Sequence, residues 1–264
     1  MRTFMIGCAM LYAMAGTVCS QARAQQREIV VDLGGGVKLE LIFIRNGSFD
    51  IGDGASLSEF EKPPHGILLT KSFYLGKYKV TQEQWQAVMG SNPSKFQSPK
   101  NPVESVSWDD CQLFLAKLNA KAGAQWGKFV LPTETQWEFA CRAGNTTDYE
   151  RLTHSTQLKD YGWYDLNSGG KTHPVGEKKP NAWGFYDMHG NVWEWCADWY
   201  GSRYYALNLR EDPTGPTEGM SRVVRGGGWN DNDWACRSTA RGDRDPMLRL
   251  NDLGLRVALT PADK

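Results

Sequence analysis

The most informative stretch of the sequence is Asn181-Ala182-Trp183-Gly184-Phe185-Tyr186-Asp187-Met188-His189-Gly190-Asn191-Val192-Trp193-Glu194-Trp195. Asp187 and Glu194 place two carboxylates seven residues apart around the pair Gly190-Asn191, which favours a tight turn. Such a turn can direct carbonyl and carboxylate oxygens toward one point, and a hard cation such as calcium prefers oxygen ligands. The alternative is a tight loop that packs its aromatic rings into the core. The spacing leaves both interpretations open.

The whole region beyond Gly144 has the same character. Gly, Asn, Asp, Pro and Trp dominate it, and eight of the eleven tryptophans lie from Trp137 onward. It has no stretch of helical period longer than one turn, yet it is too hydrophobic to be disordered. The sequence therefore predicts a packed body of loops and short strands, without an internal repeat or linker that would divide the chain.

The first half predicts regular structure. Residues 28–32 and 37–44 read as strands around three glycines, and residues 66–80 add one or two more β segments. Three capping-box sequences, each followed by apolar residues at helical spacing, predict helices that begin after Thr81, Ser107 and Thr133.

Residues 1–24 have the three parts of a secretory signal. Arg2 gives a positive start, residues 4–18 form an uncharged and mostly apolar run, and Ala22-Arg23-Ala24 is a small-x-small cleavage site. A transmembrane anchor would need about 20 apolar residues, and this run is shorter. We therefore expect cleavage after Ala24, a periplasmic or secreted protein, and a mature domain of residues 25–264 that does not span a membrane.

The charge balance excludes one class of partner. The chain has 30 Lys+Arg and 30 Asp+Glu, and removing Arg2 and Arg23 with the signal leaves 28 basic against 30 acidic residues. Binding to nucleic acid needs a surplus of positive charge on one face, so we expect no nucleic-acid partner. The sequence also lacks HExxH, CxxC and GxSxG motifs, and its four histidines are scattered.

The chain resembles the formylglycine-generating enzyme, or sulfatase-modifying-factor, family. The resemblance rests on six segments that occur in order along the chain: 77–81, 102–108, 131–142, 190–195, 225–229 and 253–256. It implies an α+β fold, the formylglycine-generating-enzyme fold related to C-type lectins. Such a fold is poor in regular secondary structure, with about three helices in the first half and short strands joined by long loops.

The resemblance also implies a structural calcium ion at the 187–194 segment. Its ligands would be the side chains of Asp187 and Glu194 and the backbone carbonyls of Gly190 and Val192. A second calcium site of the family corresponds to residues 160–176, which match poorly, so that site stays open.

The resemblance further implies a disulfide between Cys141 and Cys236, which export to an oxidising compartment would permit. The remaining cysteines of the mature chain, Cys111 and Cys196, have no pairing implied by the family. Cys111 lies on the apolar stripe of a predicted helix, so we interpret it as a buried thiol.

The chain departs from the family at the reactive centre. The enzymes of the family carry two cysteines there whose thiolates bind copper(I), a soft ion that needs sulfur ligands. Here residues 228–237 read GWNDNDWACR, and Cys236 is their only cysteine. We therefore do not expect copper(I), nor the copper-dependent oxidation of cysteine to formylglycine, and we assign no catalytic residue.

Three functions remain open, and the oligomeric state is undetermined. The first is an exported, calcium-stabilised binding or accessory module that holds a peptide, protein or glycan in a loop-lined groove. The second is a periplasmic oxidoreductase of the family, acting in protein or metabolite maturation with a cofactor that the sequence does not place. The third is a maturation enzyme whose thiols come from Cys111 and Cys196. The candidate ligand-binding residues combine aromatic faces with amide and carboxylate groups: Trp193, Trp229, Asn230, Asp231, Asp233 and Trp234. For Trp193 and Trp229, a role in the core is an equal alternative.

Overall fold

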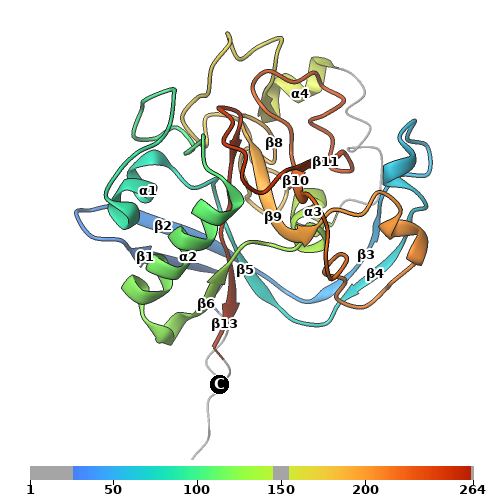
Figure 1. Ribbon diagram of the computed structural model, residues 1–264, viewed down its shortest axis with the longest axis horizontal. Coiled ribbons are helices and arrows are strands. Elements are labelled where there is room, and N and C mark those ends of the chain that lie inside the picture. Colours follow the sequence, from blue (N-terminus) through green and yellow to red (C-terminus); the bar gives the residue numbers. More distant parts are fainter. Residues whose placement is uncertain (1–25, 145–154, 263–264) are drawn as a thin grey trace, which may run out of the picture.

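The computed structural model describes residues 26–144 and 155–262 (Figure 1). The predicted signal peptide, residues 1–24, lies outside the described residues. Within the described part of the chain, no helix is long and apolar enough to cross a bilayer.

The described chain contains four α-helices and thirteen strands. The helices are α1 (Gln82–Met89), α2 (Trp108–Ala122), α3 (Glu134–Arg142) and α4 (Ser155–Tyr161). The strands of the first half are β1 (Glu28–Asp32), β2 (Lys38–Ile44), β3 (Gly47–Ile51), β4 (His65–Leu69), β5 (Phe73–Gly76) and β6 (Gly127–Val130). The second half contains β7 (Gly162–Trp163), β8 (His189–Gly190), β9 (Trp193–Trp199), β10 (Arg222–Arg225), β11 (Arg241–Arg244), β12 (Leu253–Gly254) and β13 (Ala258–Pro261).

The three predicted helices are confirmed together with their capping boxes. At α3, the Gln136 backbone amide donates to Thr133 Oγ1 at 3.1 Å, and the Thr133 amide donates to Gln136 Oε1 at 3.0 Å. The same reciprocal pair of hydrogen bonds starts α1 and α2. These bonds satisfy amides that have no partner inside the helix, so local sequence is enough to set each start.

One helix was not predicted. The fourth helix, α4, lies in the region that the sequence indicated as loops and short strands. Its apolar residue Leu158 is buried, but seven residues with few apolar side chains show no hydrophobic periodicity. The prediction of short strands holds for β7, β8 and β12, which are two residues long, but not for β9, which has seven residues.

Two larger sheets organise the fold. A five-stranded sheet has the order β1-β2-β5-β13-β6, and a four-stranded sheet has the order β11-β10-β9-β12. The last strand, β13, lies between β5 and β6 and is antiparallel to both, so the end of the chain completes the sheet of the first half. Two small sheets, β3-β4 and β7-β8, complete the α+β architecture.

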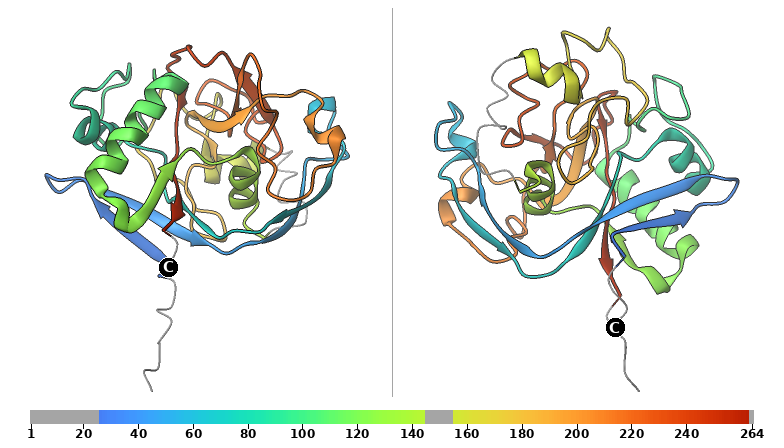
Figure 2. Two further views of the ribbon diagram at one scale, coloured as in Figure 1. Left: turned by 60° about the horizontal axis from the view of Figure 1, so that its bottom comes forward. Right: turned by 180° about the vertical axis from the view of Figure 1, so that it is seen from behind.

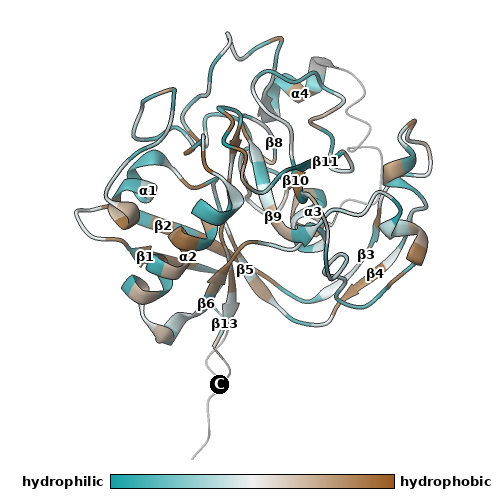
Figure 3. Ribbon diagram, viewed as in Figure 1, coloured by the Kyte–Doolittle hydropathy of each residue, from teal (hydrophilic) through white to brown (hydrophobic). Residues whose placement is uncertain are grey.

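The helices pack on these sheets (Figure 2). The long helix α2 contacts α1 and β6, whereas α3 lies against β3, β9 and β10. Trp137 of α3 is fully buried there. Hydrophobic residues concentrate in the strands around β5 and in α2, while the long loops of the second half are mainly hydrophilic (Figure 3). These loops carry the candidate site.

Candidate functional site

A groove with a volume of about 490 Å³ separates the segment 56–61 from the loop 232–242. One side carries Ser56, Leu57 and Ser58, and the other carries Asn232 and Trp234. Trp193, at the start of β9, also lines the groove. The lining therefore combines two indole rings and an exposed leucine with hydroxyl and amide groups.

Trp193 is held in place by Asp231. Its indole Nε1 donates a hydrogen bond to Asp231 Oδ2 at 2.7 Å, and the same oxygen accepts from the Gly228 amide at 2.8 Å. Burial raises the pKa of the Asp231 carboxyl, while these hydrogen bonds lower it in part. Asp231 thus positions the ring rather than lining the groove.

Trp234 is the more accessible ring, with 42% of its surface exposed. The Arg237 guanidinium lies 4.1 Å from the centre of the Trp234 ring. Arg237 also pairs with the buried carboxylate of Glu61 across the groove, through Nη2–Oε1 at 2.7 Å and Nη1–Oε2 at 3.0 Å. A bidentate pair fixes the plane of the guanidinium, so it also fixes the surface on which the Trp234 ring rests.

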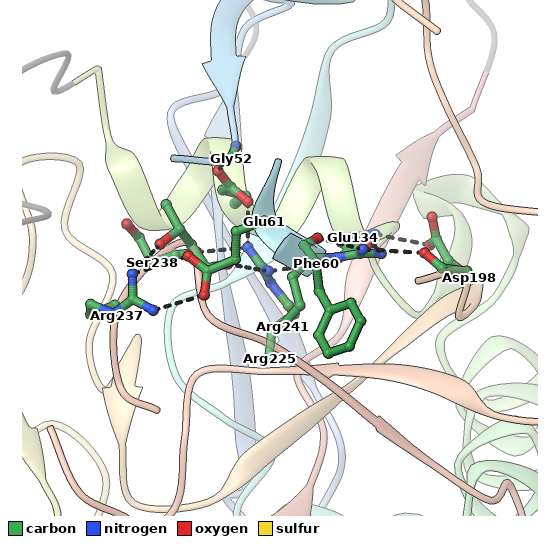
Figure 4. Close-up of polar contacts among 12 residues, drawn as sticks. Gly52, Phe60, Glu61, Glu134, Asp198, Arg225, Arg237, Ser238 and Arg241 are labelled. Carbon is green, nitrogen blue, oxygen red and sulfur yellow. Dashed lines mark hydrogen bonds and ion pairs between the residues drawn. The ribbon is translucent and has the colours of Figure 1, made fainter. Parts of the chain in front are cut away.

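A second ionic network reaches the groove through Arg241, which is part of the lining (Figure 4). Arg241 makes a bidentate pair with Glu134 at 2.7 and 2.8 Å and donates to the Phe60 carbonyl at 2.9 Å. Arg225 pairs with Glu138 and lies 3.4 Å from Glu134. Burial alone raises the pKa of Glu134, but Arg241 and Arg225 together outweigh burial and lower it. Every charged group of the groove lining is therefore already paired inside the protein.

The structure places the predicted ligand residues in two groups. Trp193 and Trp234 line the groove with the unpredicted Asn232, but Trp193 is only 6% exposed and belongs to a buried hydrophobic cluster, so the alternative core role applies to it. Trp229 does not line it, because its Nε1 donates to the Asn251 carbonyl at 3.0 Å and its ring packs edge-on against Phe96. The other predicted residues, Asn230, Asp231 and Asp233, also lie outside the lining.

The sequence did not predict the wall of the groove that residues 56–61 form. Leu57 is 82% exposed between two serines, and Glu61 is buried in the short 3₁₀ helix Glu59–Glu61. Nothing in the local sequence pairs this segment with a loop near residue 237. The one feature of the sequence that could have indicated this wall is the apolar residue Leu57 between two serines.

The four cysteines described by the structure are buried, free thiols. Cys141 Sγ lies 3.9 Å from His189 Nε2, and His189 Nδ1 lies 2.7 Å from the Cys236 carbonyl. The disulfide that the resemblance implies between Cys141 and Cys236 is thus not formed in this structure, and it stays a prediction. Burial raises the pKa of Cys141 to about 12 and that of Cys236 further.

Cys111 and Cys196 belong to two different hydrophobic clusters. Both are completely buried, and burial raises the pKa of both thiols well above the ordinary value. A reactive thiolate pair needs a low pKa and access to solvent. This placement gives no support to the interpretation of Cys111 and Cys196 as catalytic thiols.

The residues predicted to bind calcium are buried, but their oxygens are engaged. Asp187 Oδ2 accepts from the Gly176 amide at 2.7 Å. Glu194 Oε1 lies 2.5 Å from Lys79 Nζ, and Glu194 Oε2 accepts from Trp137 Nε1 at 2.7 Å. Arg256 contacts both oxygens of the same carboxylate.

The pKa of Glu194 agrees with these contacts. Burial alone raises the pKa of Glu194, but Arg256 and Lys79 outweigh it and lower the pKa to about 2. Among the described residues, no group of three or more His, Cys, Asp or Glu side chains is arranged to hold a metal ion. Because Lys79, Trp137 and Arg256 already bind both oxygens of Glu194, this carboxylate does not fit as a calcium ligand in this arrangement, and the calcium site stays a prediction.

Comparison with known proteins agrees with this architecture. Residues 36–261 match the family described as "Sulfatase-modifying factor enzyme 1-like domain". "Chaperone protein LppX" of Paenibacillus barcinonensis is 32% identical over 83% of this chain and 88% of that protein. The formylglycine-generating enzyme of Streptomyces coelicolor is 33% identical over 68% of this chain and 59% of the enzyme.

Two solved structures have the same fold over nearly the whole chain. "Treponema denticola variable protein 1" has a TM-score of 0.82 and 32% identity, and the match covers 90% of this chain and 100% of that one. PvdO from Pseudomonas aeruginosa has a TM-score of 0.77 and 25% identity with the same coverage. The family match over residues 36–261, the relatives and the shared fold lead to one conclusion: the chain belongs to the sulfatase-modifying factor family.

Proposed function

We propose that this protein is an exported binding or accessory module of the family, which holds a segment of a partner polypeptide in the groove between residues 56–61 and 232–242. The single observation that carries the proposal is the chemistry of the groove lining. The exposed ring of Trp234 and the exposed side chain of Leu57 offer apolar surface, and serine and asparagine offer hydrogen bonds. Because the charged groups of the lining are paired internally, the groove suits an uncharged stretch of peptide.

The comparisons favour a polypeptide ligand over a glycan. A relative that aligns with most of this chain is named a chaperone, and a chaperone acts on other proteins. A glycan would also stack on tryptophan rings, so it is the competing ligand that the binding experiment must include.

The buried thiols argue against formylglycine generation. Copper(I) in the family is held by two thiolates at the reactive centre, and Cys236 is the single cysteine of residues 228–237. Its side chain is buried, and burial raises its pKa, so the thiol stays protonated at neutral pH. An aldehyde detected on a co-expressed sulfatase peptide would contradict this part of the proposal.

Export belongs to the same proposal and rests on residues 1–24. We expect the mature protein to begin at Gln25 and to occur outside the cytoplasm. Mass spectrometry of the intact protein from a periplasmic or medium fraction checks this, and a mature protein that retains Arg2 would contradict it.

The binding experiment uses matched variants of two exposed leucines. Leu57, which lines the groove, is 82% exposed, and Leu166, which does not, is 75% exposed. We expect Leu57→Ser to weaken binding on a peptide array about tenfold, whereas Leu166→Ser leaves it unchanged. Trp234→Ala should weaken binding further, and Trp234→Phe should retain part of it.

The same variants are then tested on a glycan array. Retention of full peptide binding by both Leu57→Ser and Trp234→Ala would overturn the groove as the binding site. Binding to glycans alone would overturn the choice of a polypeptide ligand.

A further inference from the structure

The carboxylate of Glu194 is saturated by donors that come from three distant parts of the chain. Lys79 Nζ lies 2.5 Å from Oε1, and Trp137 Nε1 donates to Oε2 at 2.7 Å. Arg256 reaches Oε1 through Nη2 at 2.9 Å and Oε2 through Nε at 3.1 Å. A carboxylate offers about four lone-pair sites, so these contacts leave no direction for a further ligand.

The backbone forces Lys79 into this position. The Val80 amide donates to the Leu255 carbonyl at 2.9 Å, and the Val103 amide donates to the Val80 carbonyl at 2.8 Å. The first bond ties the segment that carries Lys79 to the one that carries Arg256, and the second ties it to the segment at Val103. The Lys79 side chain is consequently completely buried, with its ammonium group at the carboxylate.

The charges in this interior balance without a metal ion. Two carboxylates, Asp187 and Glu194, are 1% and 0% exposed, and two cations, Lys79 and Arg256, are each 0% exposed. A calcium ion added to this set would leave two positive charges uncompensated in a medium that solvates charge poorly.

Lys79 also occupies the space that a calcium ion beside Glu194 would need. Calcium binds carboxylate oxygens at about 2.3–2.6 Å and collects about six to eight oxygen ligands. The ammonium nitrogen of Lys79 already lies 2.5 Å from Glu194 Oε1, which is the separation at which a calcium ion would lie. An ion there would meet the charge of Lys79 at contact distance.

We infer that Lys79, together with Arg256, replaces a divalent cation at the 187–194 turn, so that this protein folds and keeps its groove in shape without calcium. Glu194 follows Trp193 directly in β9, and the Trp193 ring lines the groove. The internal ion cluster therefore supports the groove from below. This inference is independent of the proposed function, because its test uses no groove ligand.

The first measurement tests calcium independence in the wild-type mature protein. Purified without chelator, it should contain far less than one equivalent of calcium by elemental analysis. Its melting temperature should change by less than about 1 °C between excess EDTA and millimolar calcium. Stoichiometric calcium, or a fall of several degrees in EDTA, would overturn the inference.

The second measurement tests whether Lys79 stands in for the ion. Lys79→Ala removes a positive charge and opens space beside Glu194, so we expect a lower melting temperature that calcium raises by about 3 °C or more. Lys77→Ala is the matched control, since Lys77 forms partly exposed pairs with Glu28 and Glu40, away from Glu194, and its loss should create no response to calcium. Lys79→Ser also removes the charge and opens the space, and it serves if the alanine variant does not fold. Failure of both position-79 variants to respond to calcium would overturn the replacement.

Discussion

Arg237 and Glu61 lie 176 residues apart in the sequence, yet they form a bidentate ion pair, with nitrogen–oxygen distances of 2.7 and 3.0 Å. Both side chains are largely buried, and the pair joins the two walls of the groove. Arg237 also supports the ring of Trp234. The shape of the candidate site thus depends on a contact that no local sequence pattern reveals.

Breaking this pair should destabilise the protein and loosen the groove. We expect Glu61→Gln to lower the free energy of unfolding by about 3 kcal/mol, because the buried Arg237 charge then keeps the more distant carboxylate of Asp53, at 3.9 Å, in place of a bidentate partner. Urea denaturation measures the change. Glu59→Gln is the control, because the Glu59–Lys62 pair is exposed and should contribute less than about 1 kcal/mol. Equal effects of the two substitutions would contradict a special role for the Arg237–Glu61 pair.

Asp198 should make stability depend on pH in an unusual direction. Burial, with the nearby charge of Glu134, raises the pKa of Asp198 to about 7. Between about pH 4 and pH 7 the folded protein therefore binds this proton more tightly than the unfolded chain, and the contribution of Asp198 to stability falls as the pH rises. One pKa unit corresponds to about 1.4 kcal/mol, so the loss over this window is roughly 2–4 kcal/mol.

Asp198→Asn tests this linkage. An asparagine oxygen can still accept the hydrogen bond that the Glu134 backbone amide donates to Asp198 at 2.8 Å. We expect the variant to be more stable than the wild type at pH 8 and to lose this advantage by pH 5, whereas Asp109→Asn, at an exposed position, changes neither. Thermal unfolding at both pH values gives the result, and an advantage that grows toward low pH would be the opposite sign.

The state of the cysteines can be counted directly. We predict that Cys141 and Cys236 form a disulfide in protein recovered from an oxidising compartment, so denatured wild-type protein should titrate two thiols and Cys236→Ser should titrate three. Such a bridge contributes about 2–4 kcal/mol of stability. Four thiols in the exported wild-type protein would show that the bridge is absent. In the native fold the remaining thiols of Cys111 and Cys196 should not react rapidly, because both are buried.

Gly190 should tolerate no side chain. Its φ is +86°, and a Cβ atom there would lie 2.1 Å from the Trp163 carbonyl oxygen. We expect Gly190→Ala to cost about 2 kcal/mol or more, since both the conformation and the space exclude it. Gly170 has a similar φ of +78° but open space around it, so Gly170→Ala should cost only about 1 kcal/mol. Denaturant unfolding separates the two contributions, and equal costs would show that crowding is unimportant at Gly190.

The three helices of the first half are the part of the fold most directly encoded in local sequence. A capping box and an apolar stripe act within a few residues, so Thr81, Ser107 and Thr133 mark helix starts without reference to the rest of the chain. The ordered family segments then predicted the α+β architecture. The sequence did not predict the helix α4, because this short polar segment has no periodic pattern of apolar residues.

The sequence by itself determined the helix starts, the family and the tight turn at residues 187–194, because each depends on neighbouring residues or on an ordered set of motifs. Only the tertiary structure decided what surrounds that turn: the spacing of Asp187 and Glu194 predicted a cation site, whereas Lys79 and Arg256 arrive from other segments and supply the positive charge. The tertiary structure also decided the groove, since Leu57 and Trp234 come together only after the chain has folded. Charge compensation and concave surfaces arise from contacts between residues that are distant in the sequence, and the spacing of neighbouring residues cannot predict those contacts.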